Sequence, residues 1–151
     1  MCGENIFNRN IMNIKRAILF GIILYLVSFL IIGSLRILFG GYVSDTYALP
    51  LRVFVVAWIV YIPVLFFLTK WYFREVSPSV KHGFWLGIIA YLTTSFIDLV
   101  GFTSLRLAGQ PTEIYGYLYG DWKFWVTLAW GLVLCMLSGG EFDKTFTKRK
   151  S

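Results

Sequence analysis

The sequence predicts an all-α, polytopic membrane protein with four transmembrane helices in a single domain that covers residues 1–151. Composition is the first reason, because the chain is 58% hydrophobic and 15% charged, whereas soluble domains carry about 25% charged residues. Length is the second, since a soluble chain of 151 residues buries only part of its surface and could not hide this much apolar area. We therefore expect lipid to be the solvent for much of the surface.

Four apolar segments are long enough to cross a bilayer, for which a helix needs about 17–25 residues. They are residues 17–35, 53–69, 83–105 and 124–140. The alternation typical of strands is absent from them, and helices satisfy their own backbone groups in lipid. Including flanking residues, we expect helices near 15–39, 51–73, 79–107 and 122–139, with tails at 1–13 and 141–151. The first segment exceeds the usual apolar length of a signal peptide, which favours a retained helix.

The basic residues predict the orientation. Ten of the 14 Lys and Arg residues lie on the side that holds both termini, and four lie on the other: Arg36, Arg52, Arg106 and Lys123. Because basic residues gather on the cytoplasmic side, we expect both termini inside, in a multi-pass protein of the bacterial cytoplasmic membrane. The basic C-terminal tail is interpreted as a topology signal, and no nucleic acid partner is expected.

Several residues are predicted to shape the helix ends and the outer surface. Ser77 is the expected N-cap of the third helix, and Asp121 that of the fourth. Pro63 lies in the middle of the second helix, where it is expected to produce a kink. The segment 108–125 carries three Tyr and two Trp residues, which predict an aromatic belt at the outer interface.

Two similar halves are visible in the sequence. The pattern G-I-I-x-Y-L begins at Gly21 and again at Gly87, and it aligns Tyr25 with Tyr91. An Ala-Trp pair occurs in each of the second and fourth helices. Duplication of a two-helix hairpin predicts that the first and third helices meet near Gly21 and Gly87, because glycines allow close approach. Chance matching of Leu- and Ile-rich helices is the alternative.

Asp98 stands out as a charged residue inside an apolar segment. At 100° per residue, the small and polar residues of its helix share its face, and they include Tyr91, Thr94 and Ser95. Tyr25 belongs to a comparable stripe on the first helix. We therefore expect a thin polar seam inside the bundle, and this stripe, with Arg36, is our candidate ion-pair or solute seam.

Three environments would make a membrane-embedded acid tolerable, because a buried charge is costly unless it is paired or neutralised. Asp98 is expected in the outer third of the bilayer, near the depth of Arg36. The favoured prediction is an Arg36–Asp98 ion pair completed by hydrogen bonds from Thr94 and Ser95. Arg52 as the partner, or protonation of the acid, are the alternatives. A structural ion pair, a functional acid and a water-exposed acid without a role all remain open.

The residue inventory argues against enzymatic chemistry. The two cysteines, Cys2 and Cys135, are expected on different parts of the bundle, and the single histidine, His82, lies in a predicted turn. These residues form no metal-ligand spacing and no nucleophile–base pair. We therefore expect no enzyme activity, no cofactor and no metal.

A set of residues in the second half carries a resemblance: Gly87, Tyr91, Asp98-Leu99, Leu105-Arg106, Pro111 and Ala129-Trp130-Gly131. With them the chain resembles an uncharacterised bacterial family of small four-helix inner-membrane proteins. That family has Asp-Leu-Thr-Asn where this chain has Asp98-Leu99-Val100-Gly101. It also has an acid just before Ala-Trp-Gly, where this chain has Thr127-Leu128. The resemblance implies the four-helix topology, singles out Asp98 and implies no reaction.

The function expected from these features is a non-enzymatic structural or accessory component of the membrane. Its partners would be the lipid bilayer and, through apolar faces, a second copy or another membrane protein. The alternative is a subunit of a small-solute or ion transporter or channel that uses Asp98 in the polar seam.

Overall fold

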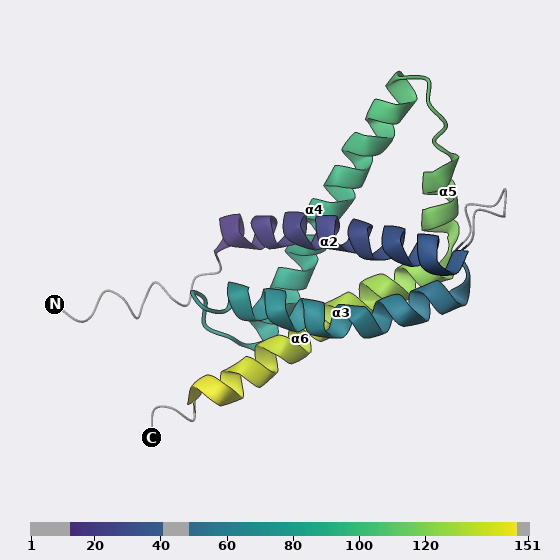
Figure 1. The fold of residues 1–151 in the computed structure, drawn as a ribbon. Coiled ribbons are helices and arrows are strands. Elements are labelled where there is room, and N and C mark those ends of the chain that lie inside the picture. The colour runs from purple at the N-terminus through teal and green to yellow at the C-terminus, as the bar shows by residue number, and fades with distance from the viewer. Residues whose placement is uncertain (1–12, 41–48, 148–151) are drawn as a thin grey trace.

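A computed structural model describes residues 13–40 and 49–147, and all its regular structure there is helical. The helices are α2 (Ile14–Gly40), α3 (Leu51–Tyr72), α4 (Val80–Leu107), α5 (Glu113–Gly120) and α6 (Trp122–Thr147) (Figure 1). The four predicted long helices are confirmed, but α6 continues through most of the predicted C-terminal tail. The short helix α5 was not predicted. Cys2 and most of the N-terminal tail lie outside the described residues.

Four of these helices, α2, α3, α4 and α6, are long and apolar enough to cross a membrane. Large apolar side chains project outward from them, including Phe29, Phe67 and Phe96, which are each more than half exposed. In a bilayer these side chains would contact lipid, because the bundle offers them no cover. The start of α2, the end of α6 and the α3–α4 turn all lie at the same end of the bundle (Figure 1).

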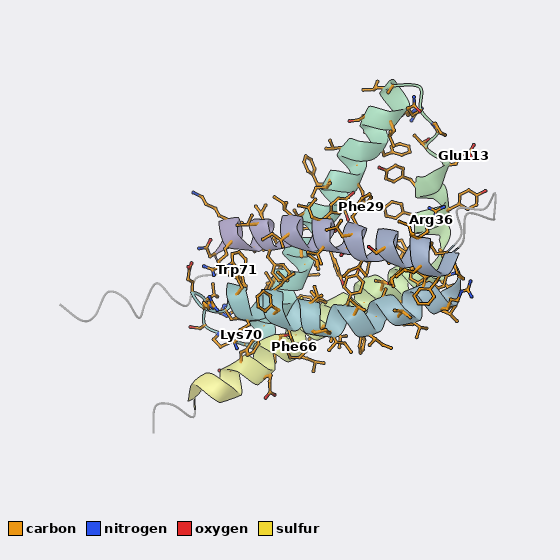
Figure 2. The ribbon with its side chains drawn as sticks, in the orientation of Figure 1. Phe29, Arg36, Phe66, Lys70, Trp71 and Glu113 are labelled. Atoms are coloured by element: carbon orange, nitrogen blue, oxygen red, sulfur yellow. The ribbon has the colours of Figure 1, made fainter. Side chains whose placement is uncertain are left out.

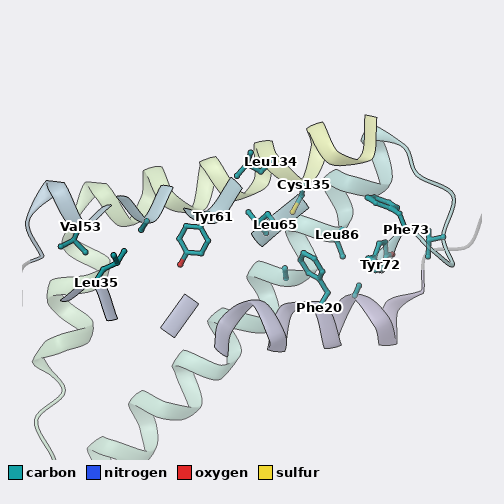
Figure 3. Close-up of a cluster of buried hydrophobic side chains, with 14 residues drawn as sticks. Phe20, Leu35, Val53, Tyr61, Leu65, Tyr72, Phe73, Leu86, Leu134 and Cys135 are labelled. Carbon is teal, nitrogen blue, oxygen red and sulfur yellow. The ribbon is translucent and has the colours of Figure 1, made fainter. Parts of the chain in front are cut away.

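The four long helices pack as a ring in the order α2, α3, α6 and α4. Their contact surface is a cluster of buried side chains, in which Phe20 of α2, Leu65 of α3, Leu86 of α4 and Cys135 of α6 meet (Figure 3). This core extends from Tyr72 and Phe73, next to the α3–α4 turn, to Leu35 and Val53 toward the other end of the bundle. At the other end, α4 runs obliquely away from its neighbours, and α5 leads the chain back to α6 (Figure 1).

Glycines allow the close contact between α4 and α6. A Cβ atom added at Gly83 would overlap the carbonyl oxygen of Cys135, and one at Gly139 would overlap that of Ser79. Such contact between helix backbones requires residues without a side chain. Gly83 on α4 and Gly139 on α6 therefore let these two helices approach each other closely.

The first and third long helices meet as predicted, but Gly21 lies opposite Ala90 and Thr93 rather than opposite Gly87. A Cβ atom at Gly21 would lie 3.1 Å from the Cα atom of Ala90, so α2 meets α4 one turn further along. Gly87 instead lies against Leu132 of α6. The aligned glycines therefore face different neighbours, because a small residue permits close packing without selecting the helix that comes close.

The two Ala-Trp pairs both serve the interface between α3 and α6. Trp58 donates its ring N–H to the Thr127 hydroxyl at 2.8 Å, and Trp130 donates to the carbonyl oxygen of Trp58 at 3.3 Å. The matching roles of Trp58 and Trp130 fit a duplicated hairpin, whereas the different neighbours of Gly21 and Gly87 do not. Duplication thus stays a hypothesis that is supported by the contact between α3 and α6.

The helix ends differ in one place from expectation. Ser79, not Ser77, is the N-cap of α4, and its hydroxyl accepts a hydrogen bond from the His82 backbone N–H at 3.1 Å. The Ser77 carbonyl oxygen instead lies 2.7 Å from the His82 ring nitrogen Nδ1. The predicted cap at Asp121 is confirmed, because its Oδ1 accepts from the Lys123 backbone N–H at 3.0 Å. Helix α3 continues through Pro63.

Arg16 joins the start of α2 to the end of α3. Its guanidinium group forms an ion pair with Glu75, donates to the carbonyl oxygen of Trp71 and stacks 4.3 Å from the centre of the Trp71 ring. Figure 2 labels Trp71 and its neighbour Lys70 at this end of the bundle. The contact fixes the entry of the chain into its first long helix.

Candidate functional site: an aspartate held by tyrosines

Asp98 lies on the part of α4 that leaves the bundle, and its side chain is half-buried. Its Oδ1 atom accepts a hydrogen bond from the Tyr25 hydroxyl at 3.1 Å. Its Oδ2 atom accepts one from the Tyr119 hydroxyl at 2.8 Å. Both oxygens of the carboxylate are therefore bound by phenols that come from two other helices, α2 and α5.

The packing of α2 explains why Tyr25 reaches the carboxylate. Gly21 stands one turn before Tyr25 on α2 and lies against Ala90 and Thr93 of α4. Residues four apart share a helix face, so Tyr25 faces α4 as well. Asp98 lies about two turns beyond Ala90 on α4, and its carboxylate is within reach of the Tyr25 phenol.

The turn back through α5 explains the second donor. Helix α4 ends at Leu107, and the positive φ of 66° at Gly109 reverses the chain. A left-handed backbone conformation of this kind favours glycine. Helix α5 then returns toward α6 and carries Tyr119 to the carboxylate, 21 residues after Asp98.

A third phenol, Tyr115, lies beside the site. It stands one turn before Tyr119 on α5, and its hydroxyl packs against Gly101, where an added Cβ atom would approach to 2.7 Å. Gly101 is one turn beyond Asp98, so its missing side chain leaves room for the Tyr115 ring. We call Tyr25, Asp98, Tyr115 and Tyr119 the Asp98 cluster.

Aromatic rings surround this cluster. Phe102 contacts Tyr115 edge-on with ring centres 5.4 Å apart, and Phe124 contacts Tyr119 in the same way at 5.0 Å. Trp125 donates its ring N–H to the Tyr119 carbonyl oxygen at 3.0 Å. The aromatic residues that predicted an interfacial belt thus also form a shell around the acid.

The two α5 tyrosines of the Asp98 cluster, Tyr115 and Tyr119, are held in their protonated form. Burial raises the pKa of Tyr119, and the hydrogen bond to Asp98 raises it further. Burial also raises the pKa of Tyr115, and the charge of Asp98 adds to the shift. Both hydroxyls therefore remain hydrogen-bond donors at neutral pH, because ordinary tyrosine already ionises near pH 10.

The predicted ion pair between Asp98 and Arg36 is wrong. Among the described residues, Arg16 pairs with Glu75 and Lys123 with Asp121, whereas Arg36 is exposed near the end of α2. Arg52, the alternative partner, donates to the Phe39 carbonyl oxygen at 2.6 Å. It thereby binds the C-terminal end of α2, a contact that basic side chains commonly make.

The other seam residues lie apart from the carboxylate. The Thr94 hydroxyl donates to the Tyr91 carbonyl oxygen at 3.0 Å, within its own helix, and Ser95 is exposed. The Tyr91 hydroxyl is buried against α6, beside Gly131 and Leu132. Of the predicted seam, only Tyr25 and Asp98 come together.

Tyr115 and Tyr119 are the site residues that sequence reasoning missed. The segment around them is too short and too rich in glycine to give an apolar periodic signal. Two features could have marked it as a helix. Pro111 and Thr112 precede Glu113, an acid in a first turn, and the two tyrosines are four residues apart on one helix face.

A buried ion pair lies where α5 meets α6. Lys123 Nζ lies 2.8 Å from Asp121 Oδ2, and both side chains are largely buried. The same amine lies 5.4 Å from the centre of the Phe54 ring on α3, a cation–π contact. Hydrogen bonds from Lys123 lower the pKa of Asp121 and outweigh the opposite effect of burial.

Within the described residues, no three His, Cys, Asp or Glu side chains are grouped to hold a metal ion. Comparison with family models, curated proteins and solved structures finds no match to the chain. The resemblance to a family of inner-membrane proteins therefore stays a prediction carried by the residues quoted for it.

Proposed function

We propose that this chain is a non-enzymatic structural or accessory protein of the bacterial cytoplasmic membrane, with both termini inside. The supporting observation is the pair of hydrogen bonds on Asp98, whose oxygens are bound by Tyr25 from α2 and Tyr119 from α5. The acid on α4 thus accepts from two other helices and links the three. It stabilises the one part of the bundle where α4 leaves its neighbours.

The energetic case rests on hydrogen-bond satisfaction. An acid in an apolar environment is costly unless its oxygens are bound, and here each oxygen has a phenol donor. A hydrogen bond between helices within a membrane contributes about 0.6 kcal/mol on average, with larger values near 1–2 kcal/mol. One such bond joins the short connecting helix α5 to α4, and the other joins α2 to α4.

The apolar surface of α4 supports a role that depends on the membrane or on a neighbour within it. Leu92, Phe96, Leu99 and Leu107 are each more than half exposed on this helix. Lipid covers such side chains in a monomer, and a second copy or another membrane protein would cover them in a complex. An accessory protein needs no more chemistry than this surface provides.

A transporter or channel subunit is the second candidate. It is favoured by one observation: the members of the Asp98 cluster are half-buried rather than sealed, so the acid is not isolated from its surroundings. In that role Asp98 would bind a small solute or an ion within the seam.

Reconstitution separates the two candidates. Wild type and Asp98→Asn are placed in liposomes, and proton and alkali-cation flux is compared with that of empty liposomes. The structural role predicts background flux for both proteins and a lower melting temperature for Asp98→Asn. Flux above background that is lost in Asp98→Asn would overturn it in favour of transport.

A further inference from the structure

We propose that the Asp98 cluster binds a lipophilic organic cation, such as a quaternary ammonium or phosphonium ion, that enters from the bilayer. This goes beyond the structural role, because it assigns a ligand class to the acid and its rings. It rests on three features of the described residues: an acid with no cationic partner, a shell of aromatic rings, and exposure toward the lipid side of α4.

The first feature is an incomplete charge balance. The two phenols supply hydrogen bonds to Asp98 but no positive charge. Within the described residues, no Lys, Arg or His nitrogen lies within 4.0 Å of the carboxylate, since the ion pairs are formed elsewhere. A charged acid in a membrane attracts a counter-charge strongly, because the low dielectric screens it little. A bound cation would complete the site.

The carboxylate can accept a ligand without losing its present contacts. An ionised carboxylate has about four lone-pair positions on its two oxygens. Two of these are used by Tyr25 and Tyr119. The remaining positions leave room for a cation to approach while both phenols stay bound.

The ring shell selects the kind of cation. Tyr25 and Tyr119 bind Asp98 directly, and the Tyr115 hydroxyl lies at Gly101, one turn further along α4. Phe102 and Phe124 contact the Tyr115 and Tyr119 rings edge-on. Aromatic faces bind organic cations through cation–π attraction, and rings in groups recognise quaternary ammonium ions. A calcium ion would need six to eight oxygen ligands, more than one carboxylate and three phenols offer.

The location of the site provides access from the bilayer. All four members of the cluster are half-buried, so the carboxylate and its rings are partly open to their surroundings. Helix α4 carries this part of the site outward from the ring of helices (Figure 1). A lipophilic cation dissolved in the membrane would therefore meet the cluster along α4, whereas a strongly hydrated inorganic ion would first have to lose its water.

Binding of tetraphenylphosphonium to the full chain in nanodiscs tests the proposal. Wild type is titrated by calorimetry with this ion, with potassium chloride, and with neutral triphenylphosphine oxide, each against empty nanodiscs. We expect saturable binding of tetraphenylphosphonium only. Asp98→Asn should weaken it at least about tenfold, because removing one partner of a desolvated charge pair is expensive.

The control variants use neighbouring groups. Glu113→Gln removes an exposed acid at the same end of the bundle and should leave binding unchanged. Tyr115→Phe keeps the ring and should retain binding, whereas Tyr115→Leu should weaken it about two- to fivefold, as loss of one cation–π contact implies. These variants leave both Asp98 hydrogen bonds in place, so they report on the site even if Asp98→Asn fails to fold.

Three results would overturn the proposal: equal binding by wild type and Asp98→Asn, equal binding of the neutral phosphine oxide, or stronger binding of potassium. Melting curves are recorded on the same samples. A stability loss in Asp98→Asn without any cation binding would refute the ligand while leaving the structural role intact.

Discussion

The two hydrogen bonds on Asp98 have different origins. Tyr25 belongs to a long helix that is packed along its length, whereas Tyr119 belongs to α5, an eight-residue helix held at few points. A helix this short gains little from its own backbone bonds, because nucleation is costly. The Tyr119 bond should therefore matter more for the position of α5 than the Tyr25 bond does for α2.

A double-mutant cycle between Tyr119→Phe and Asp98→Asn measures this bond. We expect Tyr119→Phe to cost about 1 kcal/mol of unfolding free energy, as hydrogen bonds do in proteins and membranes. In the double variant most of that cost should vanish, since the acceptor is already altered. Tyr115→Phe is the matched control and should cost less, because its hydroxyl packs on Gly101. Additive effects in a reversible detergent titration would show that the bond is absent.

Asp121 offers a prediction with a defined pH dependence. Replacing it by Ala should cost about 0.5–2 kcal/mol, as loss of an N-cap does. Asp121→Asn keeps the cap and removes the ion pair with Lys123. Because folding lowers the pKa of Asp121, its contribution is complete above the unfolded value near 4 and is lost as pH falls through the lowered pKa.

Melting curves between pH 7 and pH 3 provide the measurement. The difference in stability between wild type and Asp121→Asn should shrink toward the acid end. A difference that stays constant over this range would contradict the assigned charge interaction.

Of the residues predicted to share a seam with Asp98, only Tyr25 contacts it. Asp98 and Tyr25 were predicted from helix periodicity, which depends only on the backbone. The pairing with Arg36 came from depth along parallel helix axes, and it failed because α4 runs obliquely. No local pattern encodes that course, since it follows from glycine contacts with helices distant in the sequence.

At the scale of elements, α4 behaves as two parts. Its first part packs closely against α6 at Gly83 and Gly87. Its second part has many exposed side chains and is joined to α2 and α5 through the Asp98 cluster. Its 28 residues extend about 42 Å at roughly 1.5 Å per residue, longer than the ~30 Å of a hydrocarbon core. An oblique course accommodates this excess length.

Alanine at Gly83 or Gly139 tests the close contact of α4 with α6. The added methyl group would meet the carbonyl oxygen of Cys135 or Ser79, and backbone atoms cannot move aside as side chains can. We expect a loss of about 1–3 kcal/mol, typical of overpacking. Gly33→Ala is the control, because an added Cβ atom there has no neighbour within 4 Å.

The control should be neutral or slightly stabilising, since Ala is favoured over Gly inside helices by about 1 kcal/mol. Thermal unfolding in one detergent compares the three variants. Equal effects at Gly33 and Gly83 would mean that the two long helices do not touch as described.

The existence of the long helices was predictable, because apolar length is decided by composition. Helix α5 was not, since eight residues with two glycines carry no such signal. The cap of α4 was placed two residues early because Ser77 and Ser79 are equally good candidates, and only the backbone geometry distinguishes them.

For the molecule as a whole, the four spans put the α3–α4 turn and the α4–α5 connection on opposite sides of the membrane. Single cysteines at Val80 and Gln110, in a variant without Cys2 and Cys135, test this with a membrane-impermeant label. We expect Gln110→Cys to react from outside intact cells and Val80→Cys only after lysis. Reaction of both from the same side would refute the topology, and the reverse pattern would refute the orientation.

The Asp98 cluster also implies an order of events during synthesis. Tyr25 is already in the membrane when α4 emerges from the ribosome, whereas Tyr119 lies 21 residues behind Asp98. Inserting an aspartate at the centre of a helix costs about 2.5–3.5 kcal/mol on translocon scales. The phenol on α2 is thus the first of the two donors available to the new acid, and the one on α5 becomes available only after it. Loss of the Tyr25 hydroxyl should therefore impair membrane insertion of α4. Loss of the Tyr119 hydroxyl should instead destabilise the folded protein.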